Sequence, residues 1–288
     1  MNHTTAARGA APPSSISPAA QPALAGGATA VPAPVALTVR QFRYDLLAFA
    51  RNSQARFFTL ALPVVFLLIF ATVFGAKTVP LPGGVIHTSV YYVPGIVALG
   101  IIQAAVSNLA ISVIAQRENG NLKRRRATPI SAGVLVTARA LTAVTVSLVM
   151  TGVLGAIGWL AYSAHIPAGH IAALVVTVLV GAASFAALGF ALTTIIRGAD
   201  SAQPIIAAIT LPLYFISGIF LATTLLPGWL LNVASVFPVR PFQQALLAAY
   251  NPYSAGTGFA GHDLLVMAAW GIAGLLIAIR RFRWTPQS

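Results

Sequence analysis

Six segments of this chain are long, apolar and almost free of charged residues. An α-helix needs about 20 largely apolar residues to cross the hydrocarbon core of a bilayer. The pattern therefore predicts an all-α integral membrane protein with six transmembrane helices. The predicted spans cover residues 57–76, 91–115, 136–162, 171–196, 203–225 and 263–279.

The composition argues against a soluble fold. Apolar residues make up 58% of the 288 positions and charged residues only 7%, whereas a soluble domain carries about 25% charged residues. Such a chain cannot cover a water-exposed surface with polar groups. The chain also has no cysteine, which excludes disulfides, thiolate metal sites and cysteine nucleophiles.

The positive charges lie mostly on one side of this arrangement. The formal net charge is +13, and with the N-terminus inside, only Lys77 and Arg240 of the 17 lysines and arginines fall outside. Because Lys and Arg collect in cytoplasmic loops, we predict a multi-pass protein of the plasma membrane with both termini in the cytoplasm. This asymmetry explains the charge without a nucleic-acid partner.

Two regions divide the chain. Residues 1–36 are rich in Ala, Pro, Ser and Gly, and such a stretch cannot bury enough surface to fold. We expect a disordered tail there and a membrane domain over residues 37–285.

The membrane domain is predicted to begin with an amphipathic helix over residues 39–56. At helical spacing, Phe42 and Phe49 share one face, and Arg40, Arg43 and Arg51 share another. A basic face opposite an aromatic face is typical of a helix in the headgroup plane of a membrane, with the lipid bilayer as its partner. The alternative is an ordinary helix packed on protein.

The segment between the last two spans is too apolar for a simple loop. Residues 226–250 contain two apolar blocks, each too short to cross the bilayer. We expect a pair of short re-entrant helices in the outer leaflet. The alternative, a seventh and an eighth span, would keep the same orientation.

The residues that enzymes and proton-driven carriers need are missing from the predicted spans. The four acids, Asp45, Glu118, Asp200 and Asp263, all lie outside the middle of a span, although a proton relay usually needs a buried acid or histidine. The histidines of the predicted outer loops lack the i, i+4 spacing of a helical metal site. No GxxxxGK[ST] phosphate loop occurs. We therefore assign no catalytic residue, no metal site and no nucleotide site to this chain.

A few polar and aromatic residues inside the spans are candidates for a substrate pathway. Gln103 and Asn108 lie in the second predicted span, and Tyr214 and Phe215 lie in the fifth. The alternative is helix packing, because small and weakly polar residues also hold membrane helices together.

The densest charge cluster is RENGNLKRRRATP, residues 117–129, between the second and third spans. Asn119 and Gly120 favour a helix end, and Thr128 and Pro129 favour the start of the next helix. The segment between them is predicted to form a short basic helix near the membrane. The alternative is that these basic residues only set the orientation of the chain in the membrane and contact anionic lipid.

The stretch ENGNLKRRRATPIS resembles the E-x-G-[TN]-L-[KR]-R-x-R-A-T-P-[LI]-S segment of ABC type 2 transporter permeases. This family includes daunorubicin-resistance-like drug exporters and polysaccharide exporters. The segment YDLLAFARNSQARFF also resembles the interfacial helix of these permeases, and the likeness extends in outline over residues 38–283.

The resemblance implies that residues 117–133 form a coupling loop that docks on a separate ATP-binding subunit. Leu122 would be the apolar contact of this loop, and Arg125 departs from the leucine that many relatives have there. The positions that match the family motif are Glu118, Gly120, Leu122, Lys123, Arg124, Arg126 and Pro129.

The same resemblance implies an ATP-driven exporter of a hydrophobic or amphiphilic substrate. The partner subunit would bind ATP and Mg²⁺, this chain would bind no cofactor, and a second permease copy would complete the pathway near spans two and five. The alternatives are an ATP-independent secondary carrier and a non-transporting membrane scaffold.

Overall fold

The computed structural model describes residues 33–81, 83–119, 132–196, 198–254 and 256–281. Most of these residues are helical. In order, the elements are α1 (Pro34–Arg51), α2 (Ser53–Arg56), the π-helical turn η1 (Phe57–Ala61), α3 (Leu62–Phe74), β1 (Thr78–Leu81), β2 (Gly84–His87), α4 (Thr88–Ile102), the π-helical turn η2 (Gln103–Asn108), α5 (Leu109–Glu118), α7 (Ala132–Tyr162), η3 (Ala168–His170), α8 (Ile171–Ile195), α9 (Ala199–Ile216), η4 (Thr223–Leu225), α10 (Gly228–Val236), α11 (Val239–Tyr250) and α12 (Gly261–Arg281).

Six helical stretches of the described chain have the length and apolar composition needed to cross a membrane. These stretches are Ser53–Phe74, Thr88–Glu118, Gly133–Tyr162, Ala168–Ile195, Ala199–Ile216 and Gly261–Arg281. The prediction of an all-α architecture with six spans is therefore confirmed.

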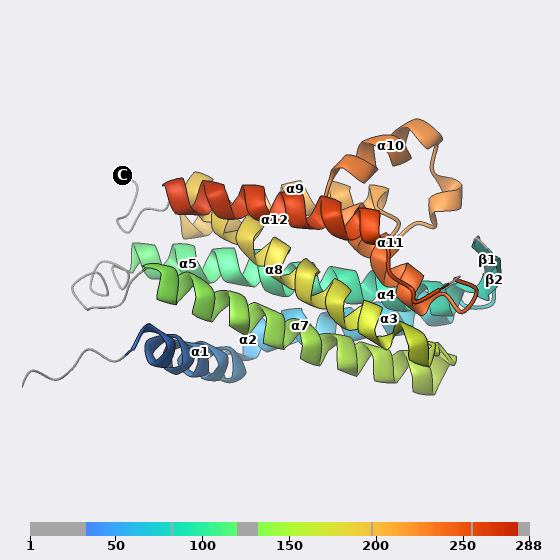
Figure 1. The fold of residues 1–288 in the computed structure, drawn as a ribbon, viewed down its shortest axis with the longest axis horizontal. Helices are drawn as coiled ribbons and strands as arrows, with labels where there is room; N and C mark the ends of the chain where they lie inside the picture. Colours follow the sequence, from blue (N-terminus) through green and yellow to red (C-terminus); the bar gives the residue numbers. More distant parts are fainter. Residues whose placement is uncertain (1–32, 82, 120–131, 197, 255, 282–288) are drawn as a thin grey trace, which may run out of the picture. The chain divides into compact units, whose positions relative to one another are not determined.

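The spanning helices lie side by side, with different elements at their two ends (Figure 1). We call one end the hairpin end, because it carries the antiparallel pair β1 and β2 together with α11. We call the other the loop end, because α5 ends and α7 begins there. Arg280 and Arg281, in the last turn of α12, also lie at the loop end.

The central element is the long helical stretch Thr88–Glu118, and 78% of its apolar 18-residue segment is buried. It contacts α3, α7, α8, α9 and α11, which explains why it contributes more residues to the apolar core than any other span. The stretch contains η2, and η1 interrupts the first span at a similar depth. The side-chain amide of Asn108 donates a hydrogen bond to the hydroxyl of Thr59, so the two π-helical turns are joined. Such turns are frequent at functional sites.

The fifth predicted span is wrong at its end. α9 ends at Ile216 instead of residue 225, because Gly218 has a φ of 96°, a left-handed conformation that interrupts a helix and that glycine adopts without strain. The hydroxyl of Tyr91 donates a hydrogen bond of 2.9 Å to the Gly218 carbonyl, which holds the turn in place. The apolar residues that follow belong to this turn and to η4.

The first helix begins inside the predicted tail. α1 starts at Pro34, because proline is well suited to the first turn of a helix; residues 34–36 are therefore helical. The rest of the predicted tail, residues 1–32, lies outside the described residues.

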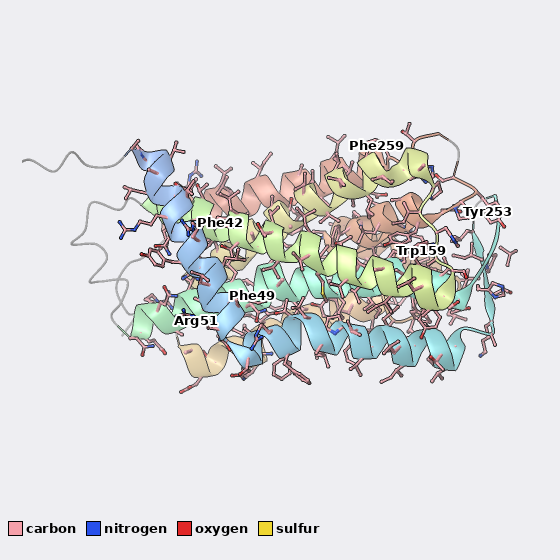
Figure 2. The ribbon with its side chains drawn as sticks, turned by 90° about the horizontal axis from the view of Figure 1, so that it is seen from below. Phe42, Phe49, Arg51, Trp159, Tyr253 and Phe259 are labelled. Atoms are coloured by element: carbon pink, nitrogen blue, oxygen red, sulfur yellow. The ribbon has the colours of Figure 1, made fainter. Side chains whose placement is uncertain are left out.

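α1 runs across the spanning helices near the loop end (Figure 2). α1 packs on α7. Phe42 and Phe49 are half-buried, whereas Arg40, Arg43 and Arg51 are exposed. The aromatic residues are therefore more buried than the basic ones, and the position of this helix in the headgroup plane of the membrane stays a prediction.

Two short helices occupy the region predicted to be re-entrant. α10 has 9 residues and α11 has 12, so neither is long enough to cross a bilayer. α11 is the more buried of the two, and Phe242 from this helix packs against Phe185 of α8.

Candidate functional site

The junction of α5 with the following loop is held by a buried arginine. The Arg117 side chain is only 3% exposed. Its Nη1 donates a hydrogen bond of 2.8 Å to the Thr193 carbonyl, and its Nη2 donates one of 2.6 Å to the Ile196 carbonyl. These carbonyls lie at the end of α8, where a helix leaves its last acceptors unpaired and favours a positive charge. Arg117 therefore caps α8.

The next residue caps the following helix. The Glu118 carboxylate accepts a hydrogen bond of 2.9 Å from the backbone N–H of Ala199, the first residue of α9. A carboxylate at a helix N-terminus satisfies a free N–H and interacts favourably with the helix dipole. Two consecutive residues of α5 thus hold both sides of the break between α8 and α9. We call Arg117 and Glu118, with these main-chain partners, the junction clamp.

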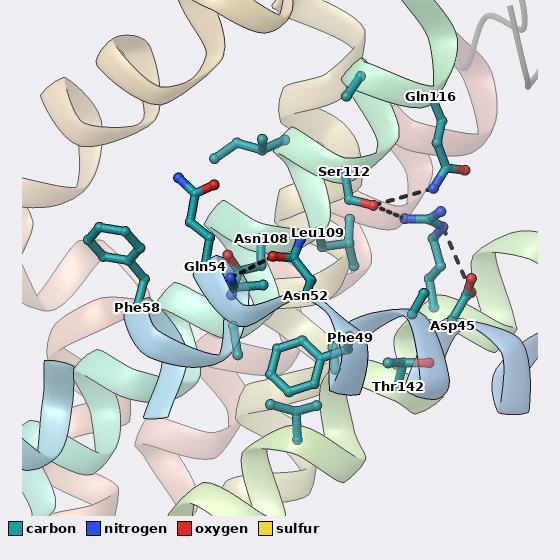
Figure 3. Close-up of a pocket in the computed structure, with 18 of the residues that line it drawn as sticks. Asp45, Phe49, Asn52, Gln54, Phe58, Asn108, Leu109, Ser112, Gln116 and Thr142 are labelled. Atoms are coloured by element: carbon teal, nitrogen blue, oxygen red, sulfur yellow. Dashed lines mark hydrogen bonds and ion pairs between the residues drawn. The ribbon is translucent and has the colours of Figure 1, made fainter. Parts of the chain in front are cut away.

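A second polar cluster ties α1 to the bundle. Nε of Arg139 in α7 lies 3.9 Å from Oδ2 of Asp45 in α1, and its Nη1 donates a hydrogen bond of 2.9 Å to the Ser112 hydroxyl in α5. The Gln41 amide donates a hydrogen bond of 2.8 Å to the other Asp45 oxygen. Figure 3 shows the contacts of Arg139 with Asp45 and Ser112. This cluster joins three elements at the loop end.

A cavity of about 650 Å³ lies beside this cluster (Figure 3). Its apolar lining includes Phe49 and Phe58, and among the described residues its ionisable lining side chains are those of Asp45 and Arg139. Seven side-chain amides also line it: Asn52 and Gln54 before α3, Gln103 and Asn108 in η2, Gln116 and Asn119 at the end of α5, and Gln203 in α9. We call this space the loop-end cavity.

A second cavity, of about 600 Å³, lies near the hairpin end. Its lining is mainly aromatic, and the Phe70 and Phe220 rings stack in its wall with centroids 5.6 Å apart. The end of α9 contributes Leu211 and Phe215. We call this space the hairpin-end cavity.

Comparison with known proteins identifies the family. The family model described as ABC-2 type transporter matches residues 35–251. The chain belongs to this family. The match runs from the start of α1 to the end of α11 and so includes five of the six spans. A search of curated proteins found no match.

Membership makes the chain an ABC transporter permease, a multi-pass membrane component of a transport system. Of the motif residues that suggested this family, the structure describes Glu118, in the junction clamp. Gly120, Leu122, Lys123, Arg124, Arg126 and Pro129 lie outside the described residues, so their role in docking stays a prediction.

The four candidate pathway residues of the permease lie at three different places. Gln103 and Asn108 line the loop-end cavity, and Phe215 lines the hairpin-end cavity. Tyr214 lines neither cavity; it is only 4% exposed and packs edge to face against Phe220. The structure does not bring the four residues into one site.

Sequence analysis missed the importance of Arg117 and Arg139 in the permease. Both were counted among the positive charges of the cytoplasmic side, which are normally exposed to water or lipid headgroups. Both are buried. The one available signal was their position in the sequence. Arg117 lies just after the second predicted span, and Arg139 lies in the first turn of the third.

Across the described residues, no group of three or more His, Cys, Asp or Glu side chains is arranged to hold a metal ion.

Proposed function

We propose that the permease is the membrane subunit of an ATP-driven exporter in the plasma membrane, which moves a hydrophobic or amphiphilic substrate out of the cytoplasm. A separate ATPase subunit would bind ATP and Mg²⁺ and dock on the coupling loop, residues 117–133. The observation that supports this most directly is the junction clamp. Because the clamp joins the beginning of this loop to the ends of α8 and α9, a partner that moves the loop also pulls on two spans.

α9 is suited to carry this movement across the membrane. It lines the loop-end cavity through Gln203 and the hairpin-end cavity through Phe215. A shift or rotation of α9 therefore changes both cavities together. An exporter needs two such packings, each open to one side, and nucleotide binding by the partner would favour one of them.

The proposed orientation places the loop end in the cytoplasm. α1, which carries Arg40 and Arg43, and the last turn of α12, which carries Arg280 and Arg281, lie at this end, in agreement with the rule that positive charge stays inside. We also propose that two permease copies assemble, with the pathway between them near spans two and five. α9 suits such an arrangement, because only 22% of this span is buried within a single chain.

Copurification tests the proposed function. A tagged chain is purified in mild detergent from native membranes beside a variant carrying Leu122→Ala, Lys123→Glu and Arg124→Glu. We expect an ATP-binding subunit to copurify with the wild type and its yield to fall at least tenfold with the variant, because a like-charge contact at an interface costs several kcal/mol.

The matched control is Arg280→Glu with Arg281→Glu. It also reverses two positive charges, in the last turn of α12. The ATP-binding subunit is expected to stay bound to this control. If no such subunit copurifies with the wild type, or if it binds both variants equally, the coupling proposal is rejected, and a carrier or a scaffold becomes the better explanation.

Glu118→Ala is expected to weaken coupling without releasing the partner. The substitution removes a helix cap worth about 1 kcal/mol, which corresponds to a change of about fivefold in an equilibrium. Coupling can be measured through a cysteine placed at Leu225, which is exposed and lines the hairpin-end cavity. In the complex with the ATPase, ATP should change the rate of maleimide labelling at this cysteine.

We expect the ATP-dependent change in labelling to fall about fivefold in Glu118→Ala. Glu118→Gln serves as the control, because its amide oxygen can still accept the hydrogen bond from Ala199. Equal responses of the wild type and Glu118→Ala would show that the loop does not act through this contact.

A further inference from the structure

The loop-end cavity concentrates one kind of polar group. The chain has 16 asparagines and glutamines, and seven of their side chains line this single cavity. They come from segments far apart in the sequence, including η2, α5 and α9. Membrane-embedded helices rarely gather polar side chains without a role in binding or transport.

We propose that the loop-end cavity binds the uncharged, polyhydroxylated head group of an amphiphile, such as the sugar of a glycolipid or glycoside. This deepens the proposed function by naming the class of substrate. The cavity volume of about 650 Å³ suits such a ligand, since small-molecule sites usually measure about 300–1,000 Å³.

The hydrogen-bonding capacity of the amides matches hydroxyl groups. Each amide offers a donor and an acceptor, as each hydroxyl does. Gln116 donates only a long hydrogen bond of 3.5 Å to Ser112, and its Oε1 is buried with no partner among the described residues. A buried acceptor without a partner is unfavourable, and a ligand hydroxyl in the cavity would satisfy it.

The charges around the cavity favour a neutral ligand. The two ionisable side chains in its lining, Asp45 and Arg139, form an ion pair with each other at 3.9 Å. Each also has a polar partner, since Gln41 bonds to the carboxylate and Ser112 to the guanidinium. The part of the lining that the structure describes therefore offers no unbalanced charge to a cationic or anionic head group.

Apolar residues complete the site for an amphiphile. Phe49 and Phe58 line the same cavity as the amides, and Phe58 is 42% exposed. An alkyl chain or an aromatic ring could lie against these rings while the head group reaches the amides. Mostly apolar walls with a few well-placed polar groups are typical of ligand sites.

A labelling-protection experiment tests this proposal with the full chain in phosphatidylcholine nanodiscs, without ATP or a partner. The chain has no native cysteine, so a cysteine placed at Ala48, in the cavity lining, is the only site that a maleimide can label. Three amphiphiles with the same alkyl chain serve as probes below their micellar concentration: octyl glucoside, octyltrimethylammonium and octyl sulfate. We expect octyl glucoside to slow labelling at a lower concentration than either charged probe.

The amide variant combines Gln54→Leu with Gln203→Leu. Both residues are exposed, and no hydrogen bond of either side chain is observed among the described residues, so we expect the fold to tolerate both changes. The loss of two hydrogen-bonding groups should raise the concentration of octyl glucoside needed for protection about tenfold. The matched control is Asn232→Leu, an exposed amide on α10 outside the cavity, which should retain the wild-type response.

A gain of specificity gives a second test. Gln54→Glu places an unbalanced negative charge in the cavity, and protection should then favour octyltrimethylammonium. Equal protection by all three probes, no protection by octyl glucoside, or full protection in the amide variant would overturn the proposal. Because the assay needs no ATPase, failure of the coupling proposal would leave this result unchanged, and the two hypotheses can be rejected separately.

Discussion

Arg117→Met is expected to destabilise the permease by about 3 kcal/mol, since each buried acceptor left unpaired costs about 1–3 kcal/mol. Methionine has a similar length and keeps the apolar contacts, but it cannot donate hydrogen bonds to the Thr193 and Ile196 carbonyls. The charge that stabilises the end of α8 is lost as well. Thermal unfolding of the purified protein in detergent should show this as a fall in Tm of about 6–12 °C.

Arg43→Met is the matched control for this measurement. Arg43 is exposed on α1, and exposed substitutions usually change stability by less than about 0.5 kcal/mol. Arg117→Lys should lie between the two, because one ammonium keeps the charge but cannot reproduce the planar fork of a guanidinium. Equal Tm values for Arg117→Met and Arg43→Met would contradict the capping role.

Gly189→Ala is expected to destabilise the permease by about 2–3 kcal/mol through overpacking. A methyl group at this position of α8 would lie 2.7 Å from the Ala105 carbonyl oxygen and 3.2 Å from Cα of Val106. Both are main-chain atoms of η2, so no side chain can rotate to make room. The helices would have to separate, and η2, which carries Gln103 and Asn108, would shift with them.

Gly152→Ala provides a control of the same chemistry. A methyl group on this glycine of α7 would meet no atom within 4 Å, and alanine favours a helix over glycine by up to about 1 kcal/mol. The expected result is therefore an unchanged or slightly higher Tm for Gly152→Ala and a clear fall for Gly189→Ala. A fall of similar size in both variants would mean that helix flexibility, and not close packing, explains the effect.

The two substitutions also separate stability from coupling. Arg117 belongs to the junction clamp, whereas Gly189 lies at the contact between α8 and η2. If the clamp transmits movement from the loop, Arg117→Lys should reduce the ATP-dependent labelling at residue 225 even where its loss of stability is small. No such loss is expected for Gly152→Ala.

The number and approximate position of the spans followed from the sequence because the length and hydropathy that a span requires can be judged for each segment alone. About 20 apolar residues are needed and are enough, whatever the neighbouring helices are. The same rule misplaced the end of the fifth span, because it cannot distinguish a helix from an apolar turn. The turn at Gly218 depends on backbone conformation and on the Tyr91 hydroxyl, which lies 127 positions earlier in the chain.

The motif at residues 117–129 was recognisable because it is local, with fixed spacing between a helix-breaking Asn-Gly pair, a leucine and a set of basic residues. The family followed from that motif, and the family model confirms it over residues 35–251. The contacts of the loop junction were not predictable in this way. Arg117 looked like one more positive charge at a membrane edge, although it is buried against α8.

By itself, the sequence determined that this chain is an all-α membrane protein of the ABC-2 type transporter family, because hydropathy and a short motif are properties of neighbouring residues. Only the tertiary structure decided which polar residues act together. It gathered seven amides from distant segments around one cavity, paired Asp45 with Arg139, and placed Arg117 and Glu118 at the break between α8 and α9. These groupings depend on how the helices pack, and no spacing within a single segment specifies them.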